Sequence, residues 1–223
     1  MKLLLLPRWT QLCLATTAAI LPACVSPPIG GGPTADERLG AVLSGELPES
    51  YTAKQRLGRS VRRISLDHPH HVPTLIADAA LSIDAGDGER AMSLLDQALS
   101  LEPENVDATV LAVGQAVRSG DVRGAQRRLD DALRLRPDHP DLYEASASIQ
   151  FVEGHYPEAL LDLDRAEALL GEKSWRNHYH RALIAESQGN IEVSKEELMA
   201  CLALAPGFQP AQRRLRGLRA QGE

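Results

Sequence analysis

Five consecutive residues, Asp67-His68-Pro69-His70-His71, are the best candidates in this chain for a metal site. Imidazole and carboxylate groups ligate zinc and copper, but three or four of them must converge on one point. Adjacent histidines in a turn do not converge easily on one ion, and no second cluster shows a recognisable ligand spacing. We therefore interpret the segment as a polar loop between helices. An enzyme or metal protein that uses these histidines is the alternative.

The other reactive side chains show no catalytic pattern. His178 and His180 lie two positions apart on a predicted helix and so face different ways. Aspartates and glutamates are scattered over predicted exposed faces, and the sequence holds no phosphate-binding glycine loop and no nucleophile motif in its usual context. The sequence therefore predicts no enzyme, no catalytic residue, no cofactor, no metal and no small-molecule substrate.

A step of 34 residues organises the elements around these side chains. Several residue types keep this step in phase, which indicates a stack of equivalent units rather than one globular core. The last members of three series come 35 residues after the previous one. The series are Pro69, Pro103, Pro137; Gly86, Gly120, Gly154, Gly189; Ala91, Ala125, Ala159; Ala98, Ala132, Ala166; Leu95, Leu129, Leu163, Leu198; and Leu101, Leu135, Leu169, Leu204.

Each unit is predicted to be a pair of helices. In Ala91–Leu101 the apolar residues fall at i, i+3, i+4, i+7 and i+8, which is one face of a helix. The second helix should end before Pro103, because proline disfavours helical geometry in the preceding residue. The periodic glycines fall in the turn between the two helices, where one residue often needs a positive φ.

This pattern resembles the tetratricopeptide repeat (TPR) family, in which a 34-residue unit carries Ala-x3-Leu in its second helix and a terminal proline. The matching residues are Ala91-x3-Leu95 with Pro103, Ala125-x3-Leu129 with Pro137, Ala159-x3-Leu163, and a weaker Ser194-x3-Leu198 with Pro206. The resemblance implies an all-α fold, a right-handed superhelical α-solenoid of helix-turn-helix repeats. It covers residues 72–208, divided into units 72–105, 106–139, 140–174 and 175–208.

The first helices depart from the family pattern. Only Tyr143 is a good match among the bulky positions, which are held by Leu75, Thr109, Tyr143 and His178. The leucine expected three residues further on is replaced by Asp78, Ala112, Ser146 and Arg181.

In this family the first helices line the concave face, which implies a surface for a protein partner. Positions four and then three apart share a helix face. The predicted partner-binding residues are Ile76, Ala80, Ile83, Val110, Gly114, Val117, Glu144, Ser148, Phe151, Tyr179, Leu183 and Glu186. We expect this trough to take an amphipathic helix or an extended peptide. The alternative is that the protein's own N-terminal helices cover these residues.

The N-terminus predicts a location. Lys2 and Arg8 precede an apolar stretch that is too short to span a bilayer and ends in Leu-Pro-Ala-Cys24. This resembles a bacterial lipoprotein signal over residues 1–23, with Cys24 lipidated; an ordinary secretory signal is the alternative. Residues 24–35 form a Pro/Gly-rich tether. Val25, where aspartate would imply inner-membrane retention, implies an outer-membrane lipoprotein that faces the periplasm.

Charge and cysteine content fit this location. The formal net charge is -6, and it falls to -8 once Lys2 and Arg8 leave with the signal, which argues against a nucleic-acid partner. Of three cysteines only Cys201 would remain free, in the column occupied elsewhere by alanine, so we expect it to be a small buried residue.

Both ends of the array are predicted to be caps. Residues 36–71 should form a helical pair, with helices at 35–47 and 51–66, that acts as a degenerate repeat. Residues 209–223 should form a C-terminal helix rich in arginine. We interpret that helix as a solvating cap, with a basic contact for an acidic partner or for lipid headgroups as the alternative.

The architecture leads to three functional hypotheses. The first is a lipid-anchored, non-enzymatic scaffold that assists assembly of an envelope machine such as a pilus or secretion system. This hypothesis rests on the resemblance to pilus-assembly TPR lipoproteins. The second is an adaptor of a peptidoglycan enzyme, of outer-membrane biogenesis or of polysaccharide export. The third is the histidine-based metal protein or enzyme.

Overall fold

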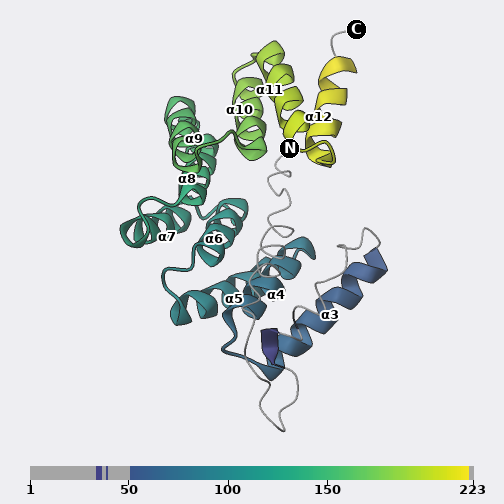
Figure 1. The fold of residues 1–223 in the computed structure, drawn as a ribbon, viewed down its shortest axis with the longest axis vertical. Coiled ribbons are helices and arrows are strands. Elements are labelled where there is room, and N and C mark those ends of the chain that lie inside the picture. Colours follow the sequence, from purple (N-terminus) through teal and green to yellow (C-terminus); the bar gives the residue numbers. More distant parts are fainter. Residues whose placement is uncertain (1–33, 37–38, 40–50, 221–223) are drawn as a thin grey trace. The chain divides into compact units, whose positions relative to one another are not determined.

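The computed structural model describes residues 34–36, 39 and 51–220, and within them it contains ten helices and no strand (Figure 1). The prediction of an all-α fold is confirmed. The expected leader, most of the tether and most of the expected helix at 35–47 lie outside the described residues. The chain forms two compact units, one ending at Gln115 and the other beginning at Ala116, and each is considered separately.

The helices alternate with short turns along the whole described chain. In order they are α3 (Tyr51–Asp67), α4 (Val72–Asp84), α5 (Gly88–Leu101), α6 (Val106–Ser119), α7 (Val122–Leu135), α8 (Pro140–Glu153), α9 (Tyr156–Leu170), α10 (Trp175–Ser187), α11 (Ile191–Leu204) and α12 (Gln209–Ala220). The first helices α4, α6, α8 and α10 begin at the residues that open the four units of the sequence period.

Local sequence explains where the helices start and stop. The turn glycines Gly86, Gly120, Gly154 and Gly189 have φ values of 81°, 85°, 83° and 79°. This left-handed conformation is strained for a residue with a Cβ, so the predicted role of the periodic glycines is confirmed. The Asp87 carboxylate accepts a hydrogen bond from the Arg90 backbone N–H at 3.2 Å, and this caps the start of α5.

In the N-terminal unit, α4 packs between α3 and α5. The core between α3 and α4 contains Leu39, Val61 and Ala77, with Leu57 and Leu81 packed against them. The buried apolar face of α3 thus lies against α4, as expected for a helix that closes one end of a repeat array.

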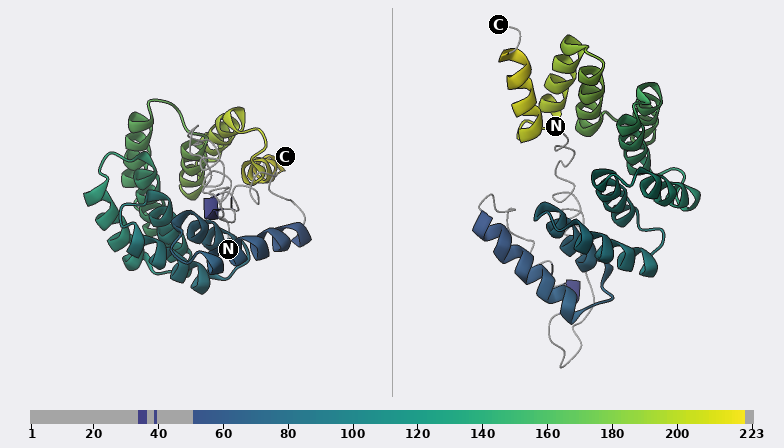
Figure 2. Two further views of the ribbon diagram at one scale, coloured as in Figure 1. Left: turned by 60° about the horizontal axis from the view of Figure 1, so that its bottom comes forward. Right: turned by 180° about the vertical axis from the view of Figure 1, so that it is seen from behind.

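In the C-terminal unit, successive helices pack as antiparallel pairs. Helix α8 packs on α9, α10 on α11, and α11 on α12, while α10 also contacts α8 and α9. Figure 2 (right) shows α10, α11 and α12 side by side at the yellow-green end of the chain. One apolar cluster joins Tyr179 and Leu183 of α10 to Phe208 and Leu215 in and before α12.

The second helices supply the regular part of the core. Three of their periodic columns are fully or almost fully buried, as predicted, whereas Leu101, Leu135 and Leu204 of the last leucine series are exposed. The buried columns are Ala91, Ala125, Ala159 and Ser194; Leu95, Leu129, Leu163 and Leu198; and Ala98, Ala132, Ala166 and Cys201. Small residues in two of the columns let paired helices approach closely, and leucine fills the space between them.

Candidate functional site

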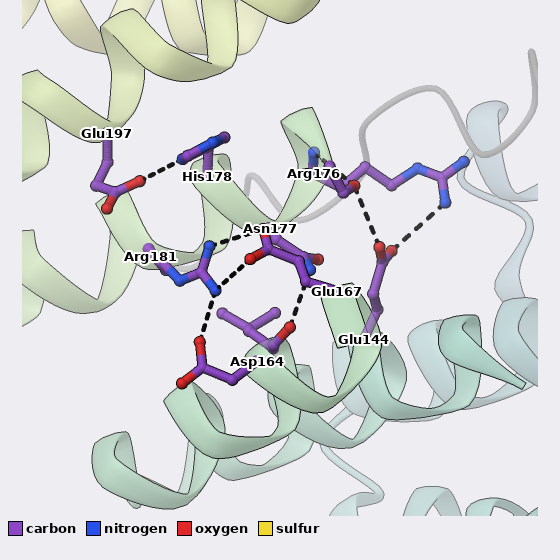
Figure 3. A network of polar contacts seen from close by, with 10 residues as sticks. Glu144, Asp164, Glu167, Arg176, Asn177, His178, Arg181 and Glu197 are labelled. Atoms are coloured by element: carbon purple, nitrogen blue, oxygen red, sulfur yellow. Dashed lines mark hydrogen bonds and ion pairs between the residues drawn. The ribbon is translucent and has the colours of Figure 1, made fainter. Parts of the chain in front are cut away.

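The first two turns of α10 carry the densest set of polar and aromatic side chains in the C-terminal unit. They point toward different neighbouring helices, and the polar contacts of four of them are drawn in Figure 3. The residues are Trp175, Arg176, Asn177, His178, Tyr179, His180 and Arg181. Helix α10 is therefore held in place by side chains that do not follow the repeat.

Arg176 joins α10 to α8 through a buried carboxylate (Figure 3). Its Nη1 donates to Glu144 Oε2 and to Asp141 Oδ1, both at 3.4 Å, and the Ser174 hydroxyl donates to Glu144 Oε1 at 3.4 Å. The Glu144 side chain is 0% exposed. Burial raises the pKa of Glu144 to about 7, against the opposing charge of Arg176. This carboxyl consequently titrates near neutral pH.

Arg181 and Asn177 join α10 to α9 (Figure 3). The two guanidinium amines of Arg181 donate to Glu167 Oε1 and Oε2, each at 2.9 Å, and Nη2 also donates to Asp164 Oδ1 at 2.7 Å. The Asn177 amide donates to the backbone carbonyl of Leu163 at 3.1 Å. The bidentate arginine contact fixes both the spacing and the rotation of the two helices.

His178 and Tyr179 face the following helices. His178 Nδ1 lies 2.6 Å from Glu197 Oε2 on α11. The Tyr179 ring meets Phe208 edge-on at 5.0 Å between centroids, and Trp175 lies 4.8 Å from the same ring. These aromatic contacts dock the segment before α12 against α10.

A hollow between α8 and α10 remains after these contacts are made. We call it the α8–α10 hollow; its lining residues are Ala147, Ser148, Phe151, His180, Leu183 and Ile184. The Ser148 hydroxyl donates to the Glu144 backbone carbonyl at 3.1 Å, and His180 Nδ1 is buried with no hydrogen-bond partner. Burial, together with the positive charge of Arg176, lowers the pKa of His180 to about 4. At neutral pH the hollow is thus uncharged and largely apolar, and its volume of about 10 Å³ leaves room for one group about the size of a water molecule.

The structure distributes the twelve predicted partner-binding residues over three environments. Three of them, Ser148, Phe151 and Leu183, line the α8–α10 hollow. Glu144 and Tyr179 are buried in the contacts described above, and Glu186 accepts a hydrogen bond from Arg214 at 2.8 Å. The remaining six lie on the first helices before α8: Ile76, Ala80, Ile83, Val110 and Val117 are buried, and Gly114 is half-buried. Their role in partner binding stays a prediction, and Cys24 lies outside the described residues.

Sequence reasoning missed Ala147, His180 and Ile184. It placed equivalent positions of successive helices on one stripe. Two neighbouring helices, however, face each other with opposite flanks, so the hollow between them is lined mostly by non-equivalent positions, with Ser148 and Leu183 as the one equivalent pair. Residues 147, 148 and 151 of α8 face residues 180, 183 and 184 of α10. Each set has helical spacing of three or four, which places its members on one face of their helix but does not reveal that these two faces meet.

Three further observations concern His71, groups that could hold a metal ion, and helices that could cross a membrane. His71 Nδ1 lies 2.6 Å from Thr74 Oγ1 and its Nε2 lies 2.9 Å from Asp36 Oδ1, so this histidine contacts the start of α4 and a residue near the N-terminus. Within the described ranges, no group of three or more His, Cys, Asp or Glu side chains is placed to hold a metal. No helix in those ranges combines the length and the apolar character needed to cross a membrane.

Comparisons with known proteins support the family resemblance. Residues 82–149 match the family model described as tetratricopeptide repeat. A comparison with curated proteins found no match. Among solved structures, a thermophilic TPR protein of Thermus thermophilus superimposes with a TM-score of 0.68 at 17% identity, over 76% of this chain and 92% of that one.

Two further structures show the same fold. A tetratricopeptide repeat protein from Parabacteroides merdae gives a TM-score of 0.70 at 16% identity, over 83% of this chain and 71% of that one. A chain of the APC/C hetero-tetramer Cut9–Hcn1 gives a TM-score of 0.66 at 15% identity, over 84% of this chain and 36% of that one. The predicted TPR-like helical solenoid is therefore confirmed as the fold.

Proposed function

We propose that this chain, whose residues 82–149 match the tetratricopeptide repeat, is a lipid-anchored scaffold that contacts a protein partner at the α8–α10 hollow. The fold itself suggests a protein–protein interaction scaffold. The observation that carries the proposal is the hollow. It is apolar and uncharged at neutral pH, and beside it lies a buried imidazole nitrogen with no hydrogen-bond partner among the described residues.

The hollow is too small for a free small molecule, so a partner would place only the methyl-sized tip of an apolar side chain in it. Phe151 and Leu183 supply apolar walls, and the polar groups are the Ser148 hydroxyl, which donates to the Glu144 carbonyl, and the buried His180 Nδ1. A peptide that lays an apolar side chain across the hollow would bury the tip of that side chain between Phe151 and Leu183. We therefore expect the partner to present an exposed apolar residue in a helix or an extended segment.

The location belongs to the same proposal. A leader over residues 1–23, lipidation at Cys24, a Pro/Gly-rich tether and Val25 together support an outer-membrane lipoprotein that faces the periplasm. A scaffold at that site would assist assembly of an envelope machine such as a pilus or secretion system. The second candidate is an adaptor of a peptidoglycan enzyme, of outer-membrane biogenesis or of polysaccharide export.

Site-specific photocrosslinking in cells tests the hollow. A photoreactive amino acid at Ser148 should crosslink to a discrete partner, whereas the same amino acid at the exposed Ser93 of α5 should not. Identification of the adduct by mass spectrometry separates the candidates: pilus or secretion proteins favour the first, and cell-wall enzymes favour the second. Equal adducts at both positions, or none at Ser148, would contradict the assignment of the hollow.

Labelling of the anchor tests the location. Cells supplied with a labelled fatty acid should incorporate it into the wild-type chain and not into a Cys24→Ala chain. A wild-type chain that never carries the label would rule out the lipoprotein part of the proposal and leave the scaffold part standing.

A further inference from the structure

Helix α3 carries a basic face that the repeat architecture does not require. Between Tyr51 and Leu66 the sequence contains five basic residues and no acidic one. The four arginines among them, Arg56, Arg59, Arg62 and Arg63, are exposed, although the mature chain as a whole is strongly acidic. A cap needs only a polar outer surface, and mixed charges would serve that purpose equally well.

Helical geometry places these arginines on one side of α3. Their spacing of three, six and seven residues from Arg56 confines them to roughly a third of the helix circumference, at about 100° per residue. Val61 and Ile64 lie on the opposite side and are buried, and Val61 packs in one cluster with Ala77 of α4. The orientation of α3 is therefore fixed by its core contacts, and the fold presents the arginines outward.

An exposed leucine lies within this basic face. Leu66 is 74% exposed, and its position on the helix falls between those of Arg59 and Arg62. Asp67, at the end of the helix, is the only carboxylate that α3 contributes. Arginines around an exposed apolar side chain match the interface of an anionic bilayer, where the cations meet headgroup phosphates and the leucine enters the acyl boundary.

We propose that the exposed face of α3, formed by Arg56, Arg59, Arg62, Arg63 and Leu66, docks onto an anionic phospholipid surface. Nucleic acid would also attract arginines, but it offers no apolar layer for Leu66. The chain position agrees with a membrane partner, since α3 begins 27 residues after Cys24. A lipid on Cys24 would hold α3 within about 90 Å of the bilayer even with the intervening chain fully extended. The inference deepens the proposed membrane location, and the test below does not depend on lipidation.

The test compares two matched sets of arginines in the full chain carrying Cys24→Ser, which cannot be lipidated at that position. The α3 variant has Arg59→Gln, Arg62→Gln and Arg63→Gln. The control variant has three equally exposed arginines of α12 replaced: Arg213→Gln, Arg216→Gln and Arg219→Gln. Both variants lose three positive charges and keep the leader. The contributions of net charge and of the leader to vesicle binding therefore cancel when the two variants are compared.

The measurement is co-sedimentation with vesicles of pure phosphatidylcholine and of phosphatidylcholine with phosphatidylglycerol. The preference for anionic vesicles should fall about a hundredfold in the α3 variant, because each arginine near an anionic surface contributes about fivefold. It should change less than threefold in the α12 variant. Leu66→Ser should weaken binding to anionic vesicles by about tenfold, since no leucine side chain is then buried in the acyl boundary of the bilayer.

The proposal would be overturned by equal losses in the α3 and α12 variants, by a parent chain with no preference for anionic vesicles, or by tighter binding to an oligonucleotide than to vesicles at the same salt. Unchanged thermal unfolding of each variant shows that binding, not folding, is measured, as expected for exposed positions. A failed lipid-labelling experiment with Cys24 leaves this comparison intact, so the two proposals can fail separately.

Discussion

Glu144 has an environment that makes stability depend on pH. Its carboxyl is fully buried between α8 and α10, and burial raises its pKa from the usual 4.5 to about 7. Between these two values the folded protein holds a proton that the unfolded chain has released, so this group's contribution to stability falls as pH rises. His180 acts in the opposite direction: its pKa is lowered to about 4, and its contribution rises between pH 4 and 6.5.

Substituting Glu144 should therefore remove this loss of stability with rising pH and leave the opposite effect of His180 in place. In Glu144→Gln the free energy of unfolding, relative to wild type, should increase by about 3 kcal/mol from pH 4.5 to pH 7.5. Denaturant unfolding at several pH values measures this difference. A difference between the two proteins that does not vary with pH would show that Glu144 titrates normally.

Cys201 should be chemically inert in the folded protein. It occupies an alanine column, is fully buried, and burial raises the pKa of its thiol to about 12. Iodoacetamide at pH 8 should leave Cys201 unmodified until denaturant is added, with the exposed position Ser100→Cys as the reactive control. Mass spectrometry of the peptides locates the label. Rapid labelling of Cys201 without denaturant would show that the α10–α11 pair opens readily.

At the scale of the helices, three of the four positions where the family expects leucine carry polar contacts. Asp78 accepts from Arg90 at 2.6 Å, Ser146 donates to Asp162 at 2.5 Å, and Arg181 binds Asp164 and Glu167. The first contact lies within the pair α4–α5 and the second within the pair α8–α9. The third joins α10 to the preceding α9. The departures from the repeat pattern thus specify which helix packs against which.

Arg181 should be important for the α9–α10 contact. Arg181→Ala would leave the half-buried Glu167 carboxylate without its bidentate partner and should lower the free energy of unfolding by about 2 kcal/mol. The exposed pair of Arg134 and Asp131, at 3.0 Å within α7, provides the control. Arg134→Ala should give no measurable change, because exposed pairs contribute little. Equal effects of the two substitutions in urea unfolding would contradict the importance of this contact.

The same elements show what could be predicted from sequence. The second helices were predictable because their buried residues repeat at one local spacing, as with Ala91, Leu95 and Ala98. The α8–α10 hollow and the contacts of α10 were not, since they join residues far apart in sequence. Glu144 and Arg176, for example, are 32 residues apart. No local period encodes such a pair.

At the scale of the whole molecule, much of the predicted partner surface belongs to the core. Ile83 in the N-terminal unit is 5% exposed and Val117 in the C-terminal unit is 9% exposed. A charge at either position would lose its hydration without gaining a partner.

Ile83→Asp and Val117→Asp should therefore each destabilise the fold by about 4 kcal/mol, a large part of the stability of a typical domain. Thermal unfolding monitored by circular dichroism would show a markedly lower midpoint. Ser148→Asp, at the half-buried edge of the hollow, should instead reduce partner crosslinking with a much smaller change in the midpoint. If Ile83→Asp and Val117→Asp unfold at the normal midpoint but no longer bind the partner, these two positions belong to an open binding surface instead.

The polar side chains of α10 also bear on how such an array can change length over time. Each unit of a repeat array contacts only its neighbours, so the array tolerates loss or gain of a whole unit when every unit presents the same surface to its neighbours. Excising the unit 140–174 here would delete Glu144, Asp164 and Glu167 and leave Arg176 and Arg181 facing a unit never matched to them. The last two repeats are expected to be inherited, duplicated or lost together.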